Sequence, residues 1–147
     1  MSNISVATAQ WEGTLESGFG TISADSSQIF TETPYSFKAR AESQVHITTP
    51  EELIAAAHAA CFSQAMSLFL NKFKKNVVAK SIYTKAEVTF EILDGSPTIS
   101  KIHLTNRSKI SDITEEQFDE LANFTKFNCP VSRALTGVEI TLDANLD

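Results

Sequence analysis

Residues 49–75 read TPEELIAAAHAACFSQAMSLFLNKFKK, and this stretch decides the fold. Thr49 is a suitable N-cap, Pro50 suits the first helical position, and Glu52 follows the cap by three residues, as in a capping box. The lysines near the end of the stretch complement the negative end of a helix dipole. The pattern therefore predicts a helix from Pro50 to about Lys75.

The middle of this helix is apolar on nearly every side. The residues concerned are Leu53, Ile54, Ala57, Cys61, Phe62, Ala65, Met66, Leu68, Phe69 and Leu70. Such a helix must be covered all round. One sheet covers only one face, so we expect the rest to meet a second helix or a partner subunit. Because the apolar run also carries His58 and Gln64, and is barely long enough to cross about 30 Å of hydrocarbon, we expect a buried helix and no membrane span.

Composition limits the class of protein. The chain has 147 residues, of which 42% are hydrophobic and 20% are charged, which predicts one globular domain over residues 1–147. The net charge of −6 repels phosphate backbones and anionic lipids, so neither nucleic acid nor membrane partners are expected. The first ten residues carry no secretion signal, which predicts a cytoplasmic location. A permanent disulfide between the two cysteines is not expected there.

The remaining segments read as strands and one further helix. Before the central helix, short strands are expected at residues 6–12, 21–24, 27–31 and 35–41, the last of them carrying Arg40. After it, we expect two long strands at 80–93 and 98–110, joined by a turn at 94–97. A capping box of Thr114 and Gln117 then predicts a helix that runs to about Phe127 and is stopped by Pro130. A last strand is expected at 138–144. This order predicts an α+β fold, and the sequence has no glycine-rich phosphate loop.

The two cysteines have different settings. Cys61 lies in the middle of the apolar helix, an environment that raises the pKa of a thiol. A reactive Cys61 therefore needs a cation from elsewhere in the fold, and Arg40 with the acidic pair at residues 51–52 is the nearest candidate in the sequence. Cys129 follows the end of the second helix, just before Pro130, where a thiol can be accessible.

Two long motifs resemble the signature of the osmotically inducible protein C (OsmC) family. They are PEELIAAAHAACFS at residues 50–63 and CPVS at residues 129–132. Shorter matches at 11–13, 34–37 and 139–143 extend the similarity over essentially the whole chain. Val131 after the Cys-Pro pair, and Arg40 just after residues 34–37, are more similar to the pattern of the OsmC branch than to that of its sister organic hydroperoxide resistance (Ohr) branch. Residues 44–49, QVHITT, depart from the glycine-containing linker of the family.

The resemblance implies both a fold and an activity. The fold is OsmC-like, with antiparallel sheets packed around a long buried central helix in an intertwined homodimer. The activity is that of a thiol peroxidase that reduces organic hydroperoxides, with hydrogen peroxide as a further candidate substrate. By motif position, Cys61 is similar to the peroxidatic cysteine, Cys129 to the resolving cysteine, and Arg40 and Glu52 to the residues that activate Cys61.

The resemblance also bears on partners. An external dithiol, with lipoylated proteins as the candidates, would reduce the Cys61–Cys129 disulfide, and no metal or organic cofactor is required. In this scheme Glu52 holds the Arg40 guanidinium through paired hydrogen bonds. The apolar side chains of Leu53, Phe62 and Phe69 would favour a substrate with a hydrocarbon tail.

Helix geometry limits how Glu52 can act. Glu52 and Cys61 are nine residues apart, and at about 100° per residue they fall on opposite sides of a straight helix. We therefore expect either that Glu52 acts on Cys61 of the other subunit or that the first helical turn bends away.

Two other classes of function remain open. His58, Cys61 and Cys129 could form a metal site, although the sequence offers no evident fourth ligand. Alternatively, the cysteine pair could record oxidation in a redox-sensing or apolar-ligand-binding module. Catalytic turnover distinguishes a sensor from an enzyme.

Overall fold

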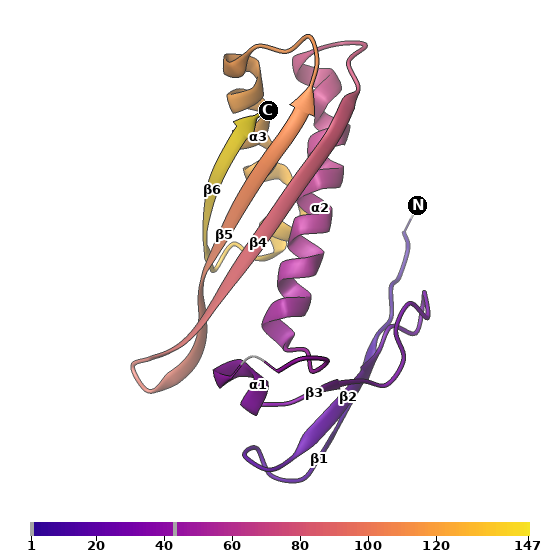
Figure 1. Ribbon diagram of the computed structural model, residues 1–147, viewed down its shortest axis with the longest axis vertical. Coiled ribbons are helices and arrows are strands. Elements are labelled where there is room, and N and C mark those ends of the chain that lie inside the picture. Colours follow the sequence, from indigo (N-terminus) through magenta and orange to yellow (C-terminus); the bar gives the residue numbers. More distant parts are fainter. Residues whose placement is uncertain (1, 43) are drawn as a thin grey trace. The chain divides into compact units, whose positions relative to one another are not determined.

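The computed structural model describes residues 2–42 and 44–147 (Figure 1). Its internal contacts divide the chain into two compact units, Met1–Leu53 and Ile54–Asp147. The elements in chain order are β1 (Thr8–Glu12), β2 (Phe19–Ser23), β3 (Thr33–Tyr35), α1 (Lys38–Ala41), α2 (Pro50–Phe73), β4 (Ala79–Leu93), β5 (Ser96–Ile110), α3 (Glu115–Asn128), α4 (Pro130–Ala134) and β6 (Glu139–Leu146).

The first unit contains an antiparallel sheet in the order β1-β2-β3. Gly20 on β2 pairs with Trp11 on β1 and with Tyr35 on β3. A side chain at Gly20 would collide with the Tyr35 ring, so glycine is needed for this ring to lie across β2. The Trp11 and Tyr35 ring centroids are 5.5 Å apart, and they form an aromatic surface on this sheet.

Two predicted strands of the first unit are not formed. Residues 27–31 make a turn in which the Gln28 N–H donates to the Ala24 carbonyl at 2.7 Å, and the positive φ of Gln28 (55°) ends any extended run. The strand predicted at 35–41 ends at Tyr35, and Arg40 lies on the helical turn α1. The Ser36 hydroxyl accepts from the Ala39 N–H at 3.2 Å, which favours a helical turn over a continued strand.

The second unit contains a sheet in the order β4-β5-β6. β4 and β5 form the predicted long hairpin, which closes tightly because Asp94 and Gly95 adopt positive φ values of 50° and 78°. β6 pairs with β5 in the parallel direction, so the prediction of purely antiparallel sheets is wrong. The physical reason is that α3 and α4 carry the chain back to the end of the sheet from which β5 starts.

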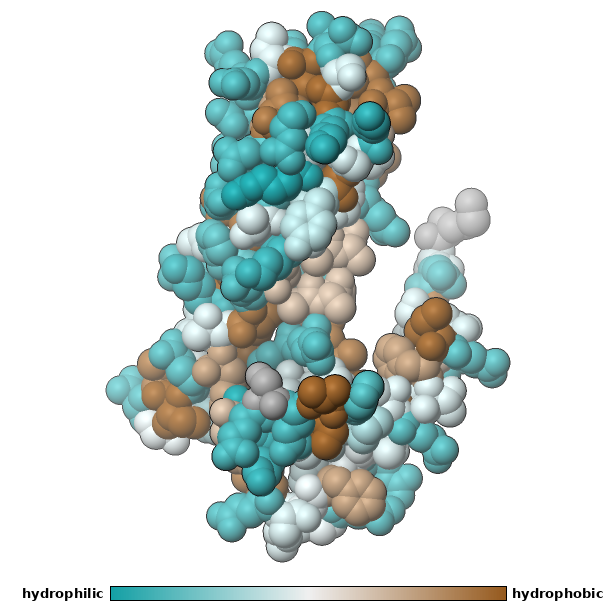
Figure 2. Space-filling view, in the orientation of Figure 1, coloured by the Kyte–Doolittle hydropathy of each residue, from teal (hydrophilic) through white to brown (hydrophobic). Residues whose placement is uncertain are grey.

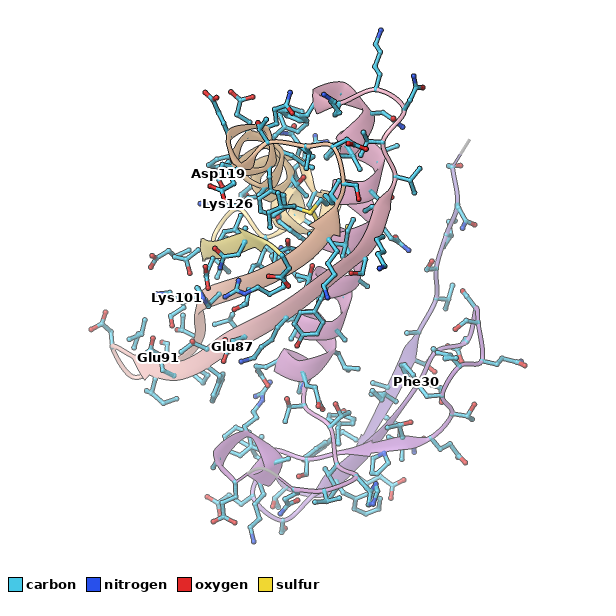
Figure 3. The ribbon with its side chains drawn as sticks, turned by 45° about the horizontal axis from the view of Figure 1, so that its top comes forward. Phe30, Glu87, Glu91, Lys101, Asp119 and Lys126 are labelled. Carbon is cyan, nitrogen blue, oxygen red and sulfur yellow. The ribbon has the colours of Figure 1, made fainter. Side chains whose placement is uncertain are left out.

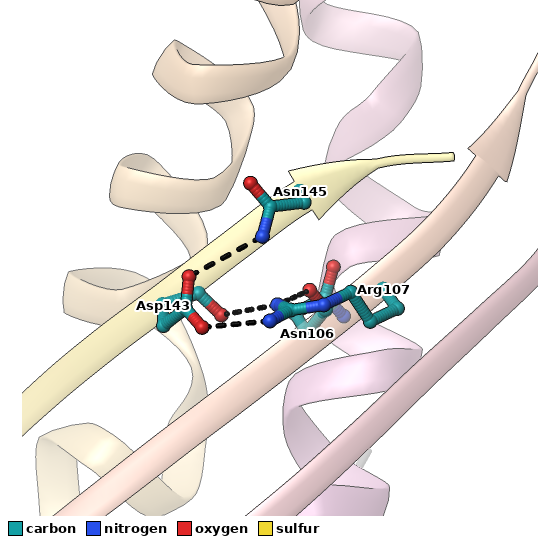
Figure 4. Close-up of polar contacts among 4 residues, drawn as sticks. All are labelled: Asn106, Arg107, Asp143 and Asn145. Carbon is teal, nitrogen blue, oxygen red and sulfur yellow. Dashed lines mark hydrogen bonds and ion pairs between the residues drawn. The ribbon is translucent and has the colours of Figure 1, made fainter.

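The outer face of this sheet is mostly polar, with an apolar patch at the tip of the β4–β5 hairpin (Figure 2). Glu87 and Glu91 on β4 and Lys101 on β5 lie along the two long strands (Figure 3). Arg107 joins β5 to β6, because its Nη2 lies 2.7 Å from Oδ2 of Asp143 (Figure 4). This face is exposed to solvent, and the core lies on the other side of the sheet.

The core of the second unit is formed where α2 and α3 pack on the sheet. Its fully buried members include Phe62, Met66, Ile102, Leu104, Phe118 and Leu121. α3 begins at the predicted capping box, in which the Thr114 hydroxyl and the Gln117 side chain each accept from the other's backbone N–H at 3.2 Å. Pro130 does follow α3, but it also opens the short helix α4.

α2 begins at Pro50 as predicted, with the Glu52 N–H donating to the Thr49 hydroxyl at 3.1 Å. It ends at Phe73, and its length and apolar composition would also suit a membrane span, a property that core helices of soluble proteins share. This chain covers only one side of it. Exposed positions recur along the other side, at Ala56, Ala57, Ala60, Gln64 and Leu68. α3 therefore does not supply the all-round cover that the sequence predicts.

Candidate active site

The two cysteines lie close together in the second unit. Both are free thiols, and Cys61 on α2 is close enough to Cys129, which lies between α3 and α4, for Cys129 to affect the pKa of Cys61. Cys129 is 0% exposed and packs in the hydrophobic core, so the expectation of an accessible thiol at the helix end is wrong. Cys61 is partly exposed. Of the pair, Cys61 is therefore the thiol that a substrate can reach.

The surroundings of Cys61 act on its acidity in opposite directions. Burial raises the pKa of the Cys61 thiol, a backbone hydrogen bond from Val131 lowers it, and the neighbouring Cys129 raises it again. The net effect is a raised pKa, which confirms the expectation for a thiol in the middle of an apolar helix. The environment that this chain gives Cys61 therefore favours the thiol over the thiolate.

The start of α4 explains why Val131 can reach the sulfur. Cys129 is the N-cap residue and Pro130 occupies the first helical position. N–H groups in the first turn of a helix have no acceptor within that helix. The Val131 N–H is one of these groups, and it lies close enough to Cys61 to lower the pKa of the thiol. The same turn thus presents both the second thiol and a hydrogen-bond donor to Cys61.

His58 lies one helical turn before Cys61 and is 0% exposed. Its Nε2 is 2.8 Å from the hydroxyl oxygen of Ser132, the third residue of α4. Within the described part of the chain its Nδ1 has no hydrogen-bond partner. Burial lowers the pKa of His58, which keeps the ring neutral. His58 is therefore a neutral, hydrogen-bonded residue inside the second unit.

Arg40 forms a two-point contact within the first unit. Its Nε donates to Oε2 of Glu51 at 3.2 Å, and its Nη2 lies 3.1 Å from Oε1 of the same carboxylate. Glu51 is only 7% exposed. Paired contacts of this kind fix the plane of a guanidinium group.

The predicted partner of Arg40, Glu52, is placed differently. The Glu52 carboxylate accepts from the Thr48 hydroxyl at 2.5 Å, and the residue is exposed. Consecutive helical residues point about 100° apart, so only one of two adjacent glutamates can face α1. The expectation that Glu52 holds the guanidinium is therefore wrong, and Glu51 takes that place.

Arg40 also lines a pocket in the first unit that the sequence did not predict. Its volume is about 220 Å³, and its lining residues are Trp11, Leu15, Tyr35, Ser36, Phe37, Arg40 and Pro50. Three of the seven residues are aromatic, two more are apolar, and Arg40 contributes the one charge among them. By contrast, of the side chains expected to contact a hydrocarbon tail, Phe62 lies in the core of the second unit and Phe69 packs against that core. The only sequence signals for the pocket were the motifs at 11–13 and 34–37.

Residues 2–42 and 44–147 contain no group of three or more His, Cys, Asp or Glu side chains placed to hold a metal ion. His58, Cys61 and Cys129 are instead engaged in the contacts described above.

Comparison with known proteins identifies the family. A family model described as OsmC-like protein matches residues 42–143. Peroxiredoxin OsmC of Escherichia coli is 41% identical over 138 residues, which cover 94% of this chain and 93% of that protein. Organic hydroperoxide resistance protein-like 2 of Staphylococcus epidermidis is 28% identical over 98 residues, covering 65% of this chain and 66% of that protein.

Solved structures agree on the fold. The OsmC like protein from Mycoplasma pneumoniae superposes with a TM-score of 0.74 at 17% identity, covering 99% of both chains. The organic hydroperoxide resistance protein OhrB of Bacillus subtilis gives a TM-score of 0.68 at 25% identity, covering 95% of this chain and 98% of the other. With a family model matched over most of its length and a relative at 41% identity, this chain belongs to the OsmC-like protein family.

Proposed function

We propose that this protein is a thiol peroxidase that reduces organic hydroperoxides to alcohols. The observation that carries the proposal is the pair of neighbouring free thiols, one partly exposed on α2 and one buried at the start of α4. A pair in this arrangement suits sequential oxidation, because only one thiol meets the oxidant and the other is held beside it. The 41% identity to a protein named peroxiredoxin OsmC supports the same activity.

The reaction proceeds in three steps. The Cys61 thiolate attacks the outer peroxide oxygen, the O–O bond breaks, and the alkoxide leaves as the alcohol after taking a proton. Cys61 is now a sulfenic acid. The Cys129 thiol attacks the Cys61 sulfur, a disulfide forms, and the sulfenic oxygen leaves as water. An external dithiol then returns both cysteines to thiols and becomes a disulfide itself.

Arg40 is proposed to favour the thiolate and to stabilise negative charge that develops on the peroxide oxygens. Such a cation is required because burial raises the pKa of Cys61. Glu51 is proposed to orient Arg40 through its two contacts. We further propose a homodimer, in which a partner subunit covers the exposed side of α2 and the arginine of one subunit serves the cysteine of the other.

The substrate and the reductant follow from the same chemistry. The aromatic pocket beside Arg40 supports a hydroperoxide with an apolar substituent, because the hydroperoxide group can face the guanidinium while the substituent contacts the rings. The reductant is proposed to be an external dithiol, with lipoylated proteins as the candidates. The location is proposed to be the cytoplasm.

Mass spectrometry tests the proposal directly. One equivalent of cumene hydroperoxide should remove two hydrogens from the wild type and give a linked Cys61–Cys129 peptide. The Cys129→Ser variant should instead hold a sulfenic acid at Cys61. Turnover of more than one peroxide per chain with a dithiol present separates an enzyme from a sensor. Thiols that stay unmodified in the wild type would overturn the proposal.

A further inference from the structure

His58 and Ser132 form a buried contact that the three chemical steps do not use. Both residues are nearly inaccessible, at 0% and 5% exposed, and Nε2 of His58 lies 2.8 Å from the Ser132 hydroxyl. They come from separate elements, α2 and α4, and are 74 positions apart in the sequence. Burying a polar pair is unfavourable unless the two groups satisfy each other, so this contact specifies how α4 docks on α2.

The tautomer of His58 follows from its surroundings. If Nε2–H donates to the Ser132 hydroxyl, the unpartnered Nδ1 atom carries only a lone pair. In the other tautomer a buried N–H would lack an acceptor, which is the more costly arrangement. The first tautomer is therefore assigned, with His58 as donor and Ser132 as acceptor.

α4 is too short to be stable as an isolated helix. It spans only Pro130–Ala134, and its backbone bonds include Arg133 N–H to the Cys129 carbonyl at 2.9 Å and Leu135 N–H to the Val131 carbonyl at 3.0 Å. Helices this short are unstable without tertiary contacts. The His58 contact supplies one such anchor, and it acts on the turn that begins with Cys129.

The same short turn carries the two residues of this region that affect the pKa of Cys61. Cys129 is its N-cap, the N–H of Val131 lowers the pKa of the Cys61 thiol, and Ser132 follows directly. On α2, His58 and Cys61 are three residues apart, so they project from the same side of the helix. A contact between His58 and Ser132 therefore fixes the Cys129 sulfur with respect to the Cys61 sulfur.

We infer that His58 is a positioning residue that, through Ser132, holds Cys129 in line for attack on the oxidised Cys61. The inference rests on the proposed function. Attack on the sulfenic sulfur requires the incoming thiol to approach along the S–O bond, and a misplacement of about 1 Å can slow such a step about a hundredfold. The peroxide step depends on Cys61 and its activating cation, so loss of the anchor should act mainly on disulfide closure.

The rate of disulfide closure between Cys61 and Cys129 can be measured in competition with a reagent that traps sulfenic acid. Protein is oxidised with one equivalent of cumene hydroperoxide in the presence of dimedone, which traps sulfenic acid, and the trapped and disulfide fractions are followed over time. In Ser132→Ala we expect closure to slow about tenfold or more, with sulfenic acid formation within about threefold of wild type. Ser132→Thr keeps the hydroxyl and should restore closure.

A matched control separates positioning from general loss of packing. Ser63 on α2 donates to the Thr84 hydroxyl on β4 at 2.8 Å, so Ser63→Ala removes a comparable hydrogen bond between α2 and a different element. It should close its disulfide at the wild-type rate. Equal slowing in Ser63→Ala and Ser132→Ala, or no slowing in Ser132→Ala, would overturn the inference. If Ser132→Ala fails to fold, His58→Gln, which retains a donor, and His58→Leu, which does not, provide the same comparison.

A second measurement does not need peroxidase activity. The cysteine pair is equilibrated with oxidised dithiothreitol, so that one disulfide forms as the other is reduced. Ser132→Ala should shift this equilibrium toward the dithiol protein by about tenfold. Without the His58–Ser132 contact, the two thiols are held together less firmly, and forming the disulfide costs more conformational entropy. If the wild type does not react with peroxide but Ser132→Ala still shows this shift relative to the wild type, the proposed function is refuted and the positioning role stands. If the equilibrium is the same in Ser132→Ala and the wild type, the positioning role is refuted.

Discussion

Arg40 and Glu51 form a forked ion pair, with the two guanidinium nitrogens Nε and Nη2 each about one hydrogen-bond length from a different carboxylate oxygen, at 3.2 and 3.1 Å. Glu51 is buried, and the Arg40 side chain is 25% exposed. The contact gives the arginine a fixed orientation at the edge of the aromatic pocket. It also makes the two adjacent glutamates of α2 unequal, since Glu52 points to Thr48 instead.

Glu51→Gln should therefore be far more damaging than Glu52→Gln. Losing the charge partner weakens the two-point contact that orients the Arg40 guanidinium, so kcat/KM for cumene hydroperoxide should fall about tenfold or more. The cost in stability should be about 1–3 kcal/mol, below that of a fully buried pair because Arg40 is partly solvated. Glu52→Gln is the matched control and should stay within about twofold in activity. Steady-state kinetics measure the loss of activity and urea unfolding measures the loss of stability. Equal losses in Glu51→Gln and Glu52→Gln would contradict the conclusion that Glu51 orients Arg40.

Arg40→Met should change the pH dependence of Cys61. Burial already raises the pKa of this thiol, and removing the cation that is proposed to serve it should raise the pKa further. The rate of reaction with cumene hydroperoxide at neutral pH should then fall about a hundredfold, and the deficit should shrink as the pH rises and the thiolate forms. Arg107→Met, which breaks the ion pair with Asp143 on the β5–β6 sheet, is the control and should keep the wild-type profile. Parallel pH profiles for Arg40→Met and wild type would exclude a role in thiolate formation.

The parts of the fold that the sequence predicts well are those with local backbone chemistry. Thr49 and Pro50 start α2, and the Thr114–Gln117 capping box starts α3, because each satisfies N–H groups at its own helix end. The long hairpin follows from alternation on both strands and a two-residue turn. The family motifs around the two cysteines likewise indicated which thiols belong together.

The parts that sequence reasoning missed depend on contacts distant in the chain. No local signal decides whether β6 runs parallel to β5, because the direction depends on the route of α3 and α4. The choice between Glu51 and Glu52 depends on which side of α2 faces α1. Cys129 looked accessible from its position before a proline, but the core of the second unit closes over it.

His58 should make the protein less stable at mildly acidic pH. Burial lowers the pKa of His58 in the folded protein below the ordinary 6.5. Between the folded pKa and pH 6.5, His58 is therefore protonated in the unfolded chain but neutral in the folded chain. The free energy of unfolding should be steady above pH 6.5 and decrease as the pH falls from 6.5 toward the folded pKa. In His58→Gln this slope should be absent, while the effect of carboxylates at lower pH remains. Urea unfolding of both proteins across this range checks it, and identical slopes would show that another group is responsible.

The aromatic pocket should discriminate among peroxides through Trp11. Its ring lies 5.5 Å from that of Tyr35, and both line the pocket with Arg40. Trp11→Ala removes apolar contact area that only a substrate with an apolar substituent can use, so KM for cumene hydroperoxide should rise about five- to tenfold. Hydrogen peroxide makes no such contact, and the kinetic constants for its reduction should stay within about twofold of the wild type.

Phe127→Ala controls for the loss of an aromatic residue. Phe127 lies on α3 and is 68% exposed, so this variant should keep the wild-type KM for both peroxides. A Trp11→Ala variant that slows the two peroxides equally would place the pocket outside substrate recognition, because only a contact with the substituent can separate them.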